Sequence, residues 1–177
     1  MSNLNDCTNF KVHNDYYTPR SAWTMIRHLI PDDKVVFEGC MLNSHKSQSP
    51  QYLMESGLKV VYDTKLNILT DTPEEDYDMI ITNPPFETAL KKQIFKRLVE
   101  IDKPFIIIIN GLNLYTKYLR EIFKDNFDKL QVINPSTKIN FDKLDYETNE
   151  LIKTKNCGFY SVFLCYKMDL KNEDLWI

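Results

Sequence analysis

The sequence predicts an α/β fold in which a mostly parallel β-sheet is covered by helices on both faces. Short apolar segments typical of strands alternate with segments of helical periodicity, and this order forms βαβ units. The apolar runs at 35–37, 79–82 and 105–109 are continuous rather than alternating, as strands buried on both faces require. The chain of 177 residues is also long enough to bury a substantial core within one domain.

The expected elements follow one another regularly along the chain. We expect strands over residues 34–38, 58–62, 78–82, 104–110, 130–134, 137–141 and 158–166. We expect helices over residues 19–30, 49–56, 87–101 and 114–127. Thr18 is the predicted N-cap of the first helix, with Pro19 in its first turn, and Gly57 is expected to close the second helix.

The composition excludes several classes of protein. Only 4 of the 177 residues are glycine, against a usual share of about 7%. No glycines have the spacing of GxGxxG or GxxxxGK, so a standard dinucleotide-binding loop and a P-loop are excluded. The four cysteines form no CxxC pair and the three histidines are isolated, so we expect no metal site and no disulfide framework.

The same features predict an intracellular protein that is not bound to a membrane. The first residues are polar and unlike a signal peptide, and the longest apolar run, at 105–109, is too short to cross a bilayer. The net charge of -3 gives no reason to expect tight nonspecific binding to nucleic acid. Charge is nevertheless uneven: residues 63–78 contain six acids and one lysine, whereas residues 91–129 contain nine bases and five acids. The basic segment is either a solvated helix surface or a flank that contacts phosphates.

In parallel sheets of this kind, ligands bind beyond the carboxyl ends of the strands. The strongest motif at such a position is the segment 78–86, an apolar strand that ends in Asn-Pro-Pro-Phe. Two consecutive prolines lack N–H donors and fix φ, so the chain leaves the sheet in a stiff, extended turn. This turn would hold two acceptors, the Asn83 side chain and the Pro84 carbonyl, beside the flat ring of Phe86.

Two acceptors and an aromatic ring suit a planar group that carries an NH2. Accepting both amine hydrogens would hold the nitrogen and stabilise the positive charge that develops when it attacks an electrophile. We therefore predict that Asn83, Pro84, Pro85 and Phe86 form the catalytic site.

This motif resembles motif IV of S-adenosylmethionine-dependent amino-methyltransferases. The whole chain resembles small adenine-N6 DNA methyltransferase-like proteins of large DNA viruses and phages. Residues 13–19 read His-Asn-Asp-Tyr-Tyr-Thr-Pro and resemble motif X of that family, whose Tyr-Thr-Pro part lies against the methionine end of the cofactor. The resemblance implies a Rossmann-like class I methyltransferase fold with a seven-stranded sheet, an antiparallel strand near the C-terminus, and S-adenosylmethionine as the cofactor.

The resemblance also implies cofactor contacts at two further strand ends. Glu38 and Gly39 follow the segment that matches the first strand of the family, whose terminal acid faces the cofactor. Asp63 ends the second strand, where an acid commonly holds the ribose hydroxyls, and Asn67 lies where the family often has an Asp near the cofactor adenine. The implied cofactor-binding residues are Tyr16, Tyr17, Thr18, Pro19, Glu38, Gly39, Asp63 and Asn67.

One loop departs from the family pattern. A glycine-rich turn usually follows the first strand, whereas residues 38–50 contain a single glycine, Gly39. The glycines of the family let the backbone pass close to the cofactor. Two interpretations remain open: the loop follows another path in which Asn43, Ser44 and Ser47 make the contacts, or cofactor binding is weakened or lost.

The chain has no insertion large enough for a separate target-recognition domain, so we predict one domain over residues 1–177. Recognition would depend on the loops 43–50, 110–117 and 135–156, the last of which contains four lysines and Tyr146. The predicted function is methyl transfer from S-adenosylmethionine to an exocyclic amine, with adenine N6 in DNA as the first choice and nucleic acid as the partner. A flipped-out base would reach Asn83. RNA bases, protein glutamine and a catalytically inactive binding protein are the alternatives, and a viral origin would place the protein in the host cytoplasm or nucleus.

Overall fold

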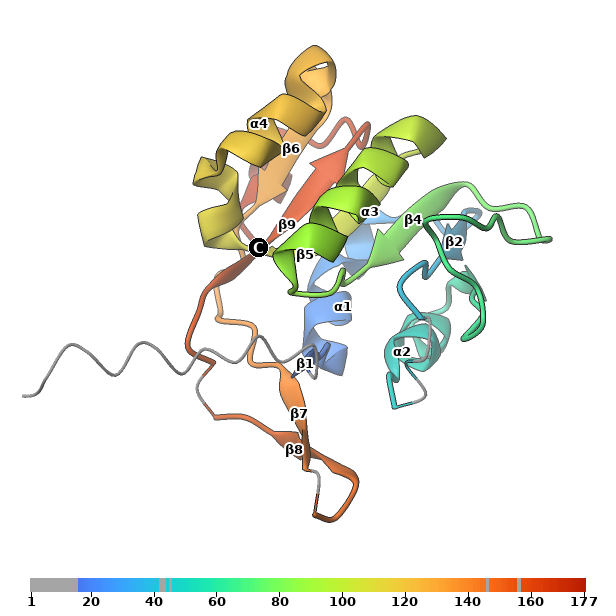
Figure 1. The fold of residues 1–177 in the computed structure, drawn as a ribbon, viewed down its shortest axis with the longest axis vertical. Helices are drawn as coiled ribbons and strands as arrows, with labels where there is room; N and C mark the ends of the chain where they lie inside the picture. Colours follow the sequence, from blue (N-terminus) through green and yellow to red (C-terminus); the bar gives the residue numbers. More distant parts are fainter. Residues whose placement is uncertain (1–15, 42–43, 45, 146, 156) are drawn as a thin grey trace, which may run out of the picture.

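The computed structural model describes residues 16–41, 44, 46–145, 147–155 and 157–177. Its larger sheet has six strands in the order β3-β2-β4-β5-β9-β6 (Figure 1). The strands are β2 (Val35–Phe37), β3 (Lys59–Val61), β4 (Met79–Thr82), β5 (Phe105–Asn110), β6 (Leu130–Ile133) and β9 (Ser161–Tyr166). The β2, β3, β4 and β5 pairings are parallel, whereas β9 runs antiparallel to β5 and β6. This arrangement confirms the α/β class and the antiparallel strand near the C-terminus.

The prediction of a seventh strand at 137–141 is wrong. Ile139 and Phe141 are buried in the core from an irregular segment, and regular strand geometry begins only at Asp142. From there β7 (Asp142–Asp145) joins a separate antiparallel sheet in the order β1-β7-β8, with β1 (Tyr16–Tyr17) and β8 (Glu150–Lys153). The sequence did not predict this small sheet, because β1 has only two residues and β8 reads Glu-Leu-Ile-Lys, which has no apolar alternation. It lies below the larger sheet in Figure 1.

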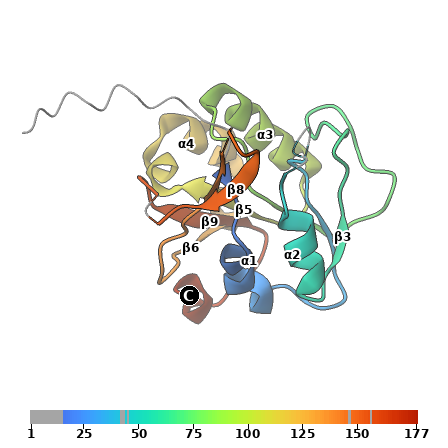
Figure 2. The same ribbon diagram turned by 90° about the horizontal axis from the view of Figure 1, so that it is seen from below.

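Helices cover both faces of the larger sheet, as predicted (Figure 2). One face carries α1 (Arg20–Ile26) and α2 (Ser49–Glu55), and the other carries α3 (Thr88–Ile101) and α4 (Lys117–Phe123). Short 3-10 helices continue or connect these elements: η2 (Arg27–Leu29), η3 (Gly111–Tyr115), η4 (Lys124–Lys129) and η5 (Asn172–Leu175). Strand residues alternate between two apolar cores: Ile81 and Ile106 pack with Trp23 of α1, while Ile80 and Ile107 pack with Phe95 of α3. In the described part of the chain, no helix has the length and apolar character needed to cross a bilayer.

Some helix ends differ from the sequence-based expectation. The N-cap of α1 is Pro19 and makes no side-chain hydrogen bond, so the prediction that Thr18 caps this helix is wrong. Gly57 ends the α2 region with φ of +92°, which confirms its predicted closing role. The expected helix over 114–127 is broken into three parts, with a non-helical Asn126 inside η4.

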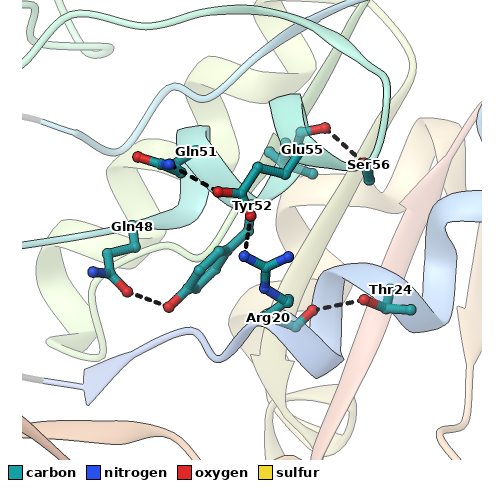
Figure 3. A network of polar contacts seen from close by, with 8 residues as sticks. Arg20, Thr24, Gln48, Gln51, Tyr52, Glu55 and Ser56 are labelled. Carbon is teal, nitrogen blue, oxygen red and sulfur yellow. Dashed lines mark hydrogen bonds and ion pairs between the residues drawn. The ribbon is translucent and has the colours of Figure 1, made fainter.

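A polar network joins α1 to α2 (Figure 3). Arg20 pairs with Glu55, and its guanidinium carbon lies 5.0 Å from the centre of the Tyr52 ring. Beneath this network, the Trp23 indole N–H donates to Ser49 Oγ at 3.1 Å. The Arg20 contacts hold the middle and the end of α2 against α1, and the Trp23 contact fixes its start. The residues just before and at that start contribute to the pocket described below.

Candidate active site

A pocket of about 310 Å3 lies where β2 and β4 end beside β1. Because both strands run parallel, their carboxyl ends meet at the same edge of the sheet. Eight of the predicted site residues line this pocket: Tyr16, Tyr17, Thr18, Glu38, Asn83, Pro84, Pro85 and Phe86. Its other lining residues are Cys40, Met41, Ser44, Ser47, Ser49 and Leu90. The structure thus brings together residues from three distant parts of the sequence.

Asn83 supplies an unpaired acceptor at this pocket. It follows directly on Thr82, the last residue of β4, and precedes the two prolines that turn the chain out of the sheet. Its Oδ1 atom is buried and accepts no hydrogen bond from the residues that the structure describes. An orphaned buried acceptor costs about 1–3 kcal/mol, so a group that donates to it would recover this energy on binding.

Phe86 is held by other aromatic rings rather than projecting freely. Its ring centre lies 5.3 Å from that of Tyr16, 5.6 Å from that of Phe141 and 5.3 Å from that of Phe159. The Lys91 ammonium, which is buried, donates to the Phe86 carbonyl at 3.4 Å, and burial lowers the pKa of this lysine. These contacts fix the Asn-Pro-Pro-Phe turn from its distal end.

Glu38 is a buried carboxyl group that also lines this pocket and is only 3% exposed. The Thr82 hydroxyl donates to Glu38 Oε1, and the Cys40 N–H donates to the same oxygen at 3.2 Å. Burial raises the pKa of Glu38 to about 7, against the lowering effect of these two hydrogen bonds. Burial and the neighbouring Glu38 charge raise the pKa of the Cys40 thiol to about 12, so this thiol stays protonated. The pocket therefore holds a carboxyl group that changes charge near neutral pH.

The loop after β2 contributes hydroxyl groups to the pocket in place of the glycines of the family pattern. Ser44 and Ser47, two of the three residues suggested for this role, line the pocket together with Ser49. The third, Asn43, lies outside the described residues, as do His13 of the motif X segment and Tyr146 of the loop 135–156.

The remaining predicted cofactor residues do not line this pocket. Pro19 lies at the start of α1, beside a different cavity. Asp63 belongs to a second pocket of about 360 Å3 at the end of β3, where its Oδ1 accepts from the Lys65 N–H at 2.8 Å. Asn67 closes its own turn, since its Oδ1 accepts from the Leu69 N–H at 3.1 Å.

Gly39 follows Glu38 and lies against the Ile68 side chain. A Cβ atom on Gly39 would lie 2.6 Å from Ile68 Cδ1 and 3.0 Å from Phe37 Cε1. Ile68 is itself buried. A larger residue at this position would therefore require the Ile68 side chain to shift.

Sequence reasoning missed the residues that support the site. Thr82 binds Glu38, Lys91 binds the Phe86 carbonyl, and Phe141 and Phe159 pack on Phe86. A hydroxyl at the last position of a buried strand was a usable signal for Thr82, because a buried hydroxyl needs a partner. No local signal marks Phe141 and Phe159, which reach Phe86 only through the tertiary fold.

No family model and no curated protein matches the sequence. Solved structures do match: a Listeria monocytogenes protein described as a class I S-adenosylmethionine-dependent methyltransferase has a TM-score of 0.53 and 11% identity, over 89% of this chain and 63% of that one. A TehB-like SAM-dependent methyltransferase from Corynebacterium glutamicum has a TM-score of 0.45 and 13% identity, over 81% and 84% of the two chains. An rRNA methylase from Streptococcus thermophilus has a TM-score of 0.42 and 8% identity, over 82% and 92%.

At these identities the similarity concerns the fold and leaves the substrate open. The larger sheet of this chain has the order β3-β2-β4-β5-β9-β6, with β9 antiparallel to β5. The protein has the α/β fold of class I S-adenosylmethionine-dependent methyltransferases.

Proposed function

We propose that this protein transfers a methyl group from S-adenosylmethionine to an exocyclic amine, with adenine N6 in DNA as the acceptor. The observation that carries the proposal is the buried Oδ1 of Asn83, which has no hydrogen-bond partner among the residues that the structure describes. It lies at the end of β4, in a pocket that Phe86 also lines. An amine hydrogen is the kind of donor that this acceptor lacks.

The residues of the turn match the needs of amine chemistry. The lone pair of an aromatic amine is delocalised into its ring, so the nitrogen is a weak nucleophile. Hydrogen bonds from its two N–H groups to the Asn83 Oδ1 and the Pro84 carbonyl would favour a pyramidal nitrogen and stabilise its developing positive charge. The two prolines keep these acceptors fixed, which limits the reorganisation needed during attack.

The pocket residues also suit the methionine end of the cofactor. The Glu38 carboxyl group and the hydroxyl groups of Ser44 and Ser47 would bind its polar atoms, with Tyr16 and Thr18 on the side of β1. Asp63 lies shortly after β3, the strand next to β2, and would bind a ribose along the same edge of the sheet. When bound, S-adenosylmethionine supplies an electrophilic methyl group on a sulfonium centre.

The test is a methyl-transfer assay with radiolabelled cofactor and three acceptors: unmethylated DNA, RNA and a glutamine-containing peptide. We expect label in DNA, recovered as N6-methyladenine by nucleoside analysis. Label in RNA or peptide alone would contradict the DNA assignment while keeping the amine chemistry. Transfer at the wild-type rate by Asn83→Ala would contradict the mechanism.

A binding protein without activity is the second candidate, and the position of Asp63 favours it, because Asp63 lines a different pocket from Glu38 and Asn83. Calorimetry with S-adenosylmethionine separates the candidates. Heat of binding at micromolar to millimolar cofactor supports the enzyme. Absence of binding at millimolar cofactor, with no shift in the melting temperature, supports the inactive protein.

A further inference from the structure

Exposed aromatic side chains lie next to β5 and β9, at the same edge of the larger sheet as the candidate active site. Tyr115, in η3 after β5, is 80% exposed, and Tyr160, directly before β9, is 72% exposed. The two segments are joined, because the Gly111 N–H donates to the Tyr160 carbonyl at 2.8 Å. Leu112, in the same 3-10 helix, is also largely exposed. Large apolar side chains at this exposure are a signal of an interaction surface when several lie together.

This surface is continuous with the candidate active site. Phe159, which precedes Tyr160, packs on Phe86 of the Asn-Pro-Pro-Phe turn with a ring-centre distance of 5.3 Å. Thr82 of β4 pairs with Ile107 of β5, so Asn83 and the segment after Asn110 leave the sheet at the same edge. A polymer that reaches the pocket from this side would cross Tyr160.

The charge around these tyrosines favours a polyanion. The segments 110–120, 134–141 and 153–160 leave or enter the sheets at this edge and contain five basic residues and no acidic residue. The Lys138 ammonium lies 4.6 Å from the centre of the Tyr160 ring. Lys117 follows Tyr115 closely and pairs with Glu121 at 3.4 Å on the exposed surface of α4, a contact that costs little to exchange for a phosphate.

We propose that Tyr115 and Tyr160 form a stacking platform for the unpaired bases of a nucleic-acid strand, with Lys138 and Lys117 contacting its phosphates. The proposal rests on the proposed function, and it adds that the strand is bound in unpaired form beside the target base. Exposed aromatic rings between basic side chains bind single strands because every base has a face that can stack. In a duplex the bases stack on one another and are not open to these rings.

The test measures binding without methyl transfer. A fluorescently labelled single-stranded DNA and its blunt duplex are titrated with the full chain, and anisotropy gives each Kd. We expect tighter binding of the single strand, and a loss of about tenfold for each tyrosine replaced by alanine, in the variants Tyr115→Ala and Tyr160→Ala. The duplex affinity should change much less.

Two matched variants control for folding and for general surface effects. Tyr115→Phe with Tyr160→Phe keeps both rings and should bind the single strand as the wild type does. Phe127→Ala removes a 54% exposed ring from η4, the segment that enters β6 at the opposite edge of the sheet, and should leave binding unchanged. Wild-type affinity in the double alanine variant, or equal affinity for single strand and duplex, would overturn the platform.

The outcomes also separate this inference from the proposed function. Binding that depends on both tyrosines, in a protein that transfers no methyl group to any acceptor, supports the platform and refutes the enzyme. Methyl transfer to DNA that the double alanine variant performs at the wild-type rate and KM supports the enzyme and refutes the platform.

Discussion

The candidate active site lies at one edge of the larger sheet, and the two ends of this edge differ in charge and in the exposure of their apolar side chains. At the β3 end, the segment 63–78 carries six acids and one lysine, and Ile68 from this segment packs over Gly39. At the β5 and β9 end, the three segments described above carry five bases and no acid, and Tyr115 and Tyr160 are open to solvent. We call these the acidic end and the aromatic end.

The difference shows that a small net charge can result from acidic and basic residues that lie in separate regions of the molecule. The net charge of -3 indicates no affinity for nucleic acid when it is spread over the whole chain. Divided between the two ends, the same charges would repel phosphates from the β3 side and attract them to the β9 side. Asn83 lies between the ends, since β4 lies between β2 and β5.

The largest effect is expected at this central position. Asn83→Ala should lower methyl transfer by at least about a hundredfold, the order found when one charge-stabilising group is removed from an active site. It should not lower the melting temperature, because the lost Oδ1 is a buried acceptor without a partner among the described residues. Turnover and thermal unfolding of the same preparation measure both quantities. A large fall in melting temperature would mean that Asn83 is a structural residue.

On the acidic side of Asn83, Glu38→Gln should change the pH dependence of stability. The folded protein keeps the Glu38 proton up to about pH 7, whereas an ordinary carboxyl group releases it near pH 4.5. The folded state thus binds more protons between these values, and the stabilising contribution is fully present below pH 4.5 and lost as the pH rises to 7. At pH 8 the Gln variant should be more stable by about 3 kcal/mol, and below pH 4 the two proteins should be equal.

Urea unfolding of wild type and variant across this pH range measures the difference. Other carboxyl groups titrate in both proteins and cancel in the comparison. Parallel curves for the two proteins would mean that folding does not shift the pKa of Glu38.

A smaller effect on stability is expected from changes to the contact between Ile68 and Gly39. Gly39→Ala should lower the free energy of unfolding by about 1–3 kcal/mol, because its Cβ would collide with the buried end of Ile68. Ile68→Val removes that end and should cost about 1 kcal/mol by itself. The double variant should lose less than the sum of the two changes, as residues in contact are not additive. Strict additivity in denaturant unfolding would contradict the contact.

The smallest effect is expected on nucleic-acid binding, when one lysine from each end is replaced in turn. Lys138→Gln should weaken single-strand binding a few-fold at low salt and reduce the salt dependence of log Kd, since one phosphate contact is lost. Lys65→Gln, in the acidic segment, is the matched control and should leave both quantities unchanged. Equal effects of the two substitutions would remove the distinction between the ends.

Much of the fold could be predicted from local features. Continuous apolar runs located β2, β4 and β5, and helical periodicity located α1 and α3, because both signals depend on neighbouring residues. The strand at 137–141 could not be judged in this way: Ile139 and Phe141 have the right composition, but the strand needs pairing partners, which become available only from Asp142 onward. The small sheet escaped prediction for the same reason.

The sequence by itself determined the α/β class and the stiff turn that carries Asn83, because proline geometry and apolar periodicity act over a few residues. Only the tertiary structure decided which predicted residues meet. The strand order placed Glu38 beside Asn83 and left Asp63 in a second pocket, and Asn67 was drawn into its own turn. It also placed Ile68 on Gly39, because contacts between segments distant in the chain depend on how the whole chain packs.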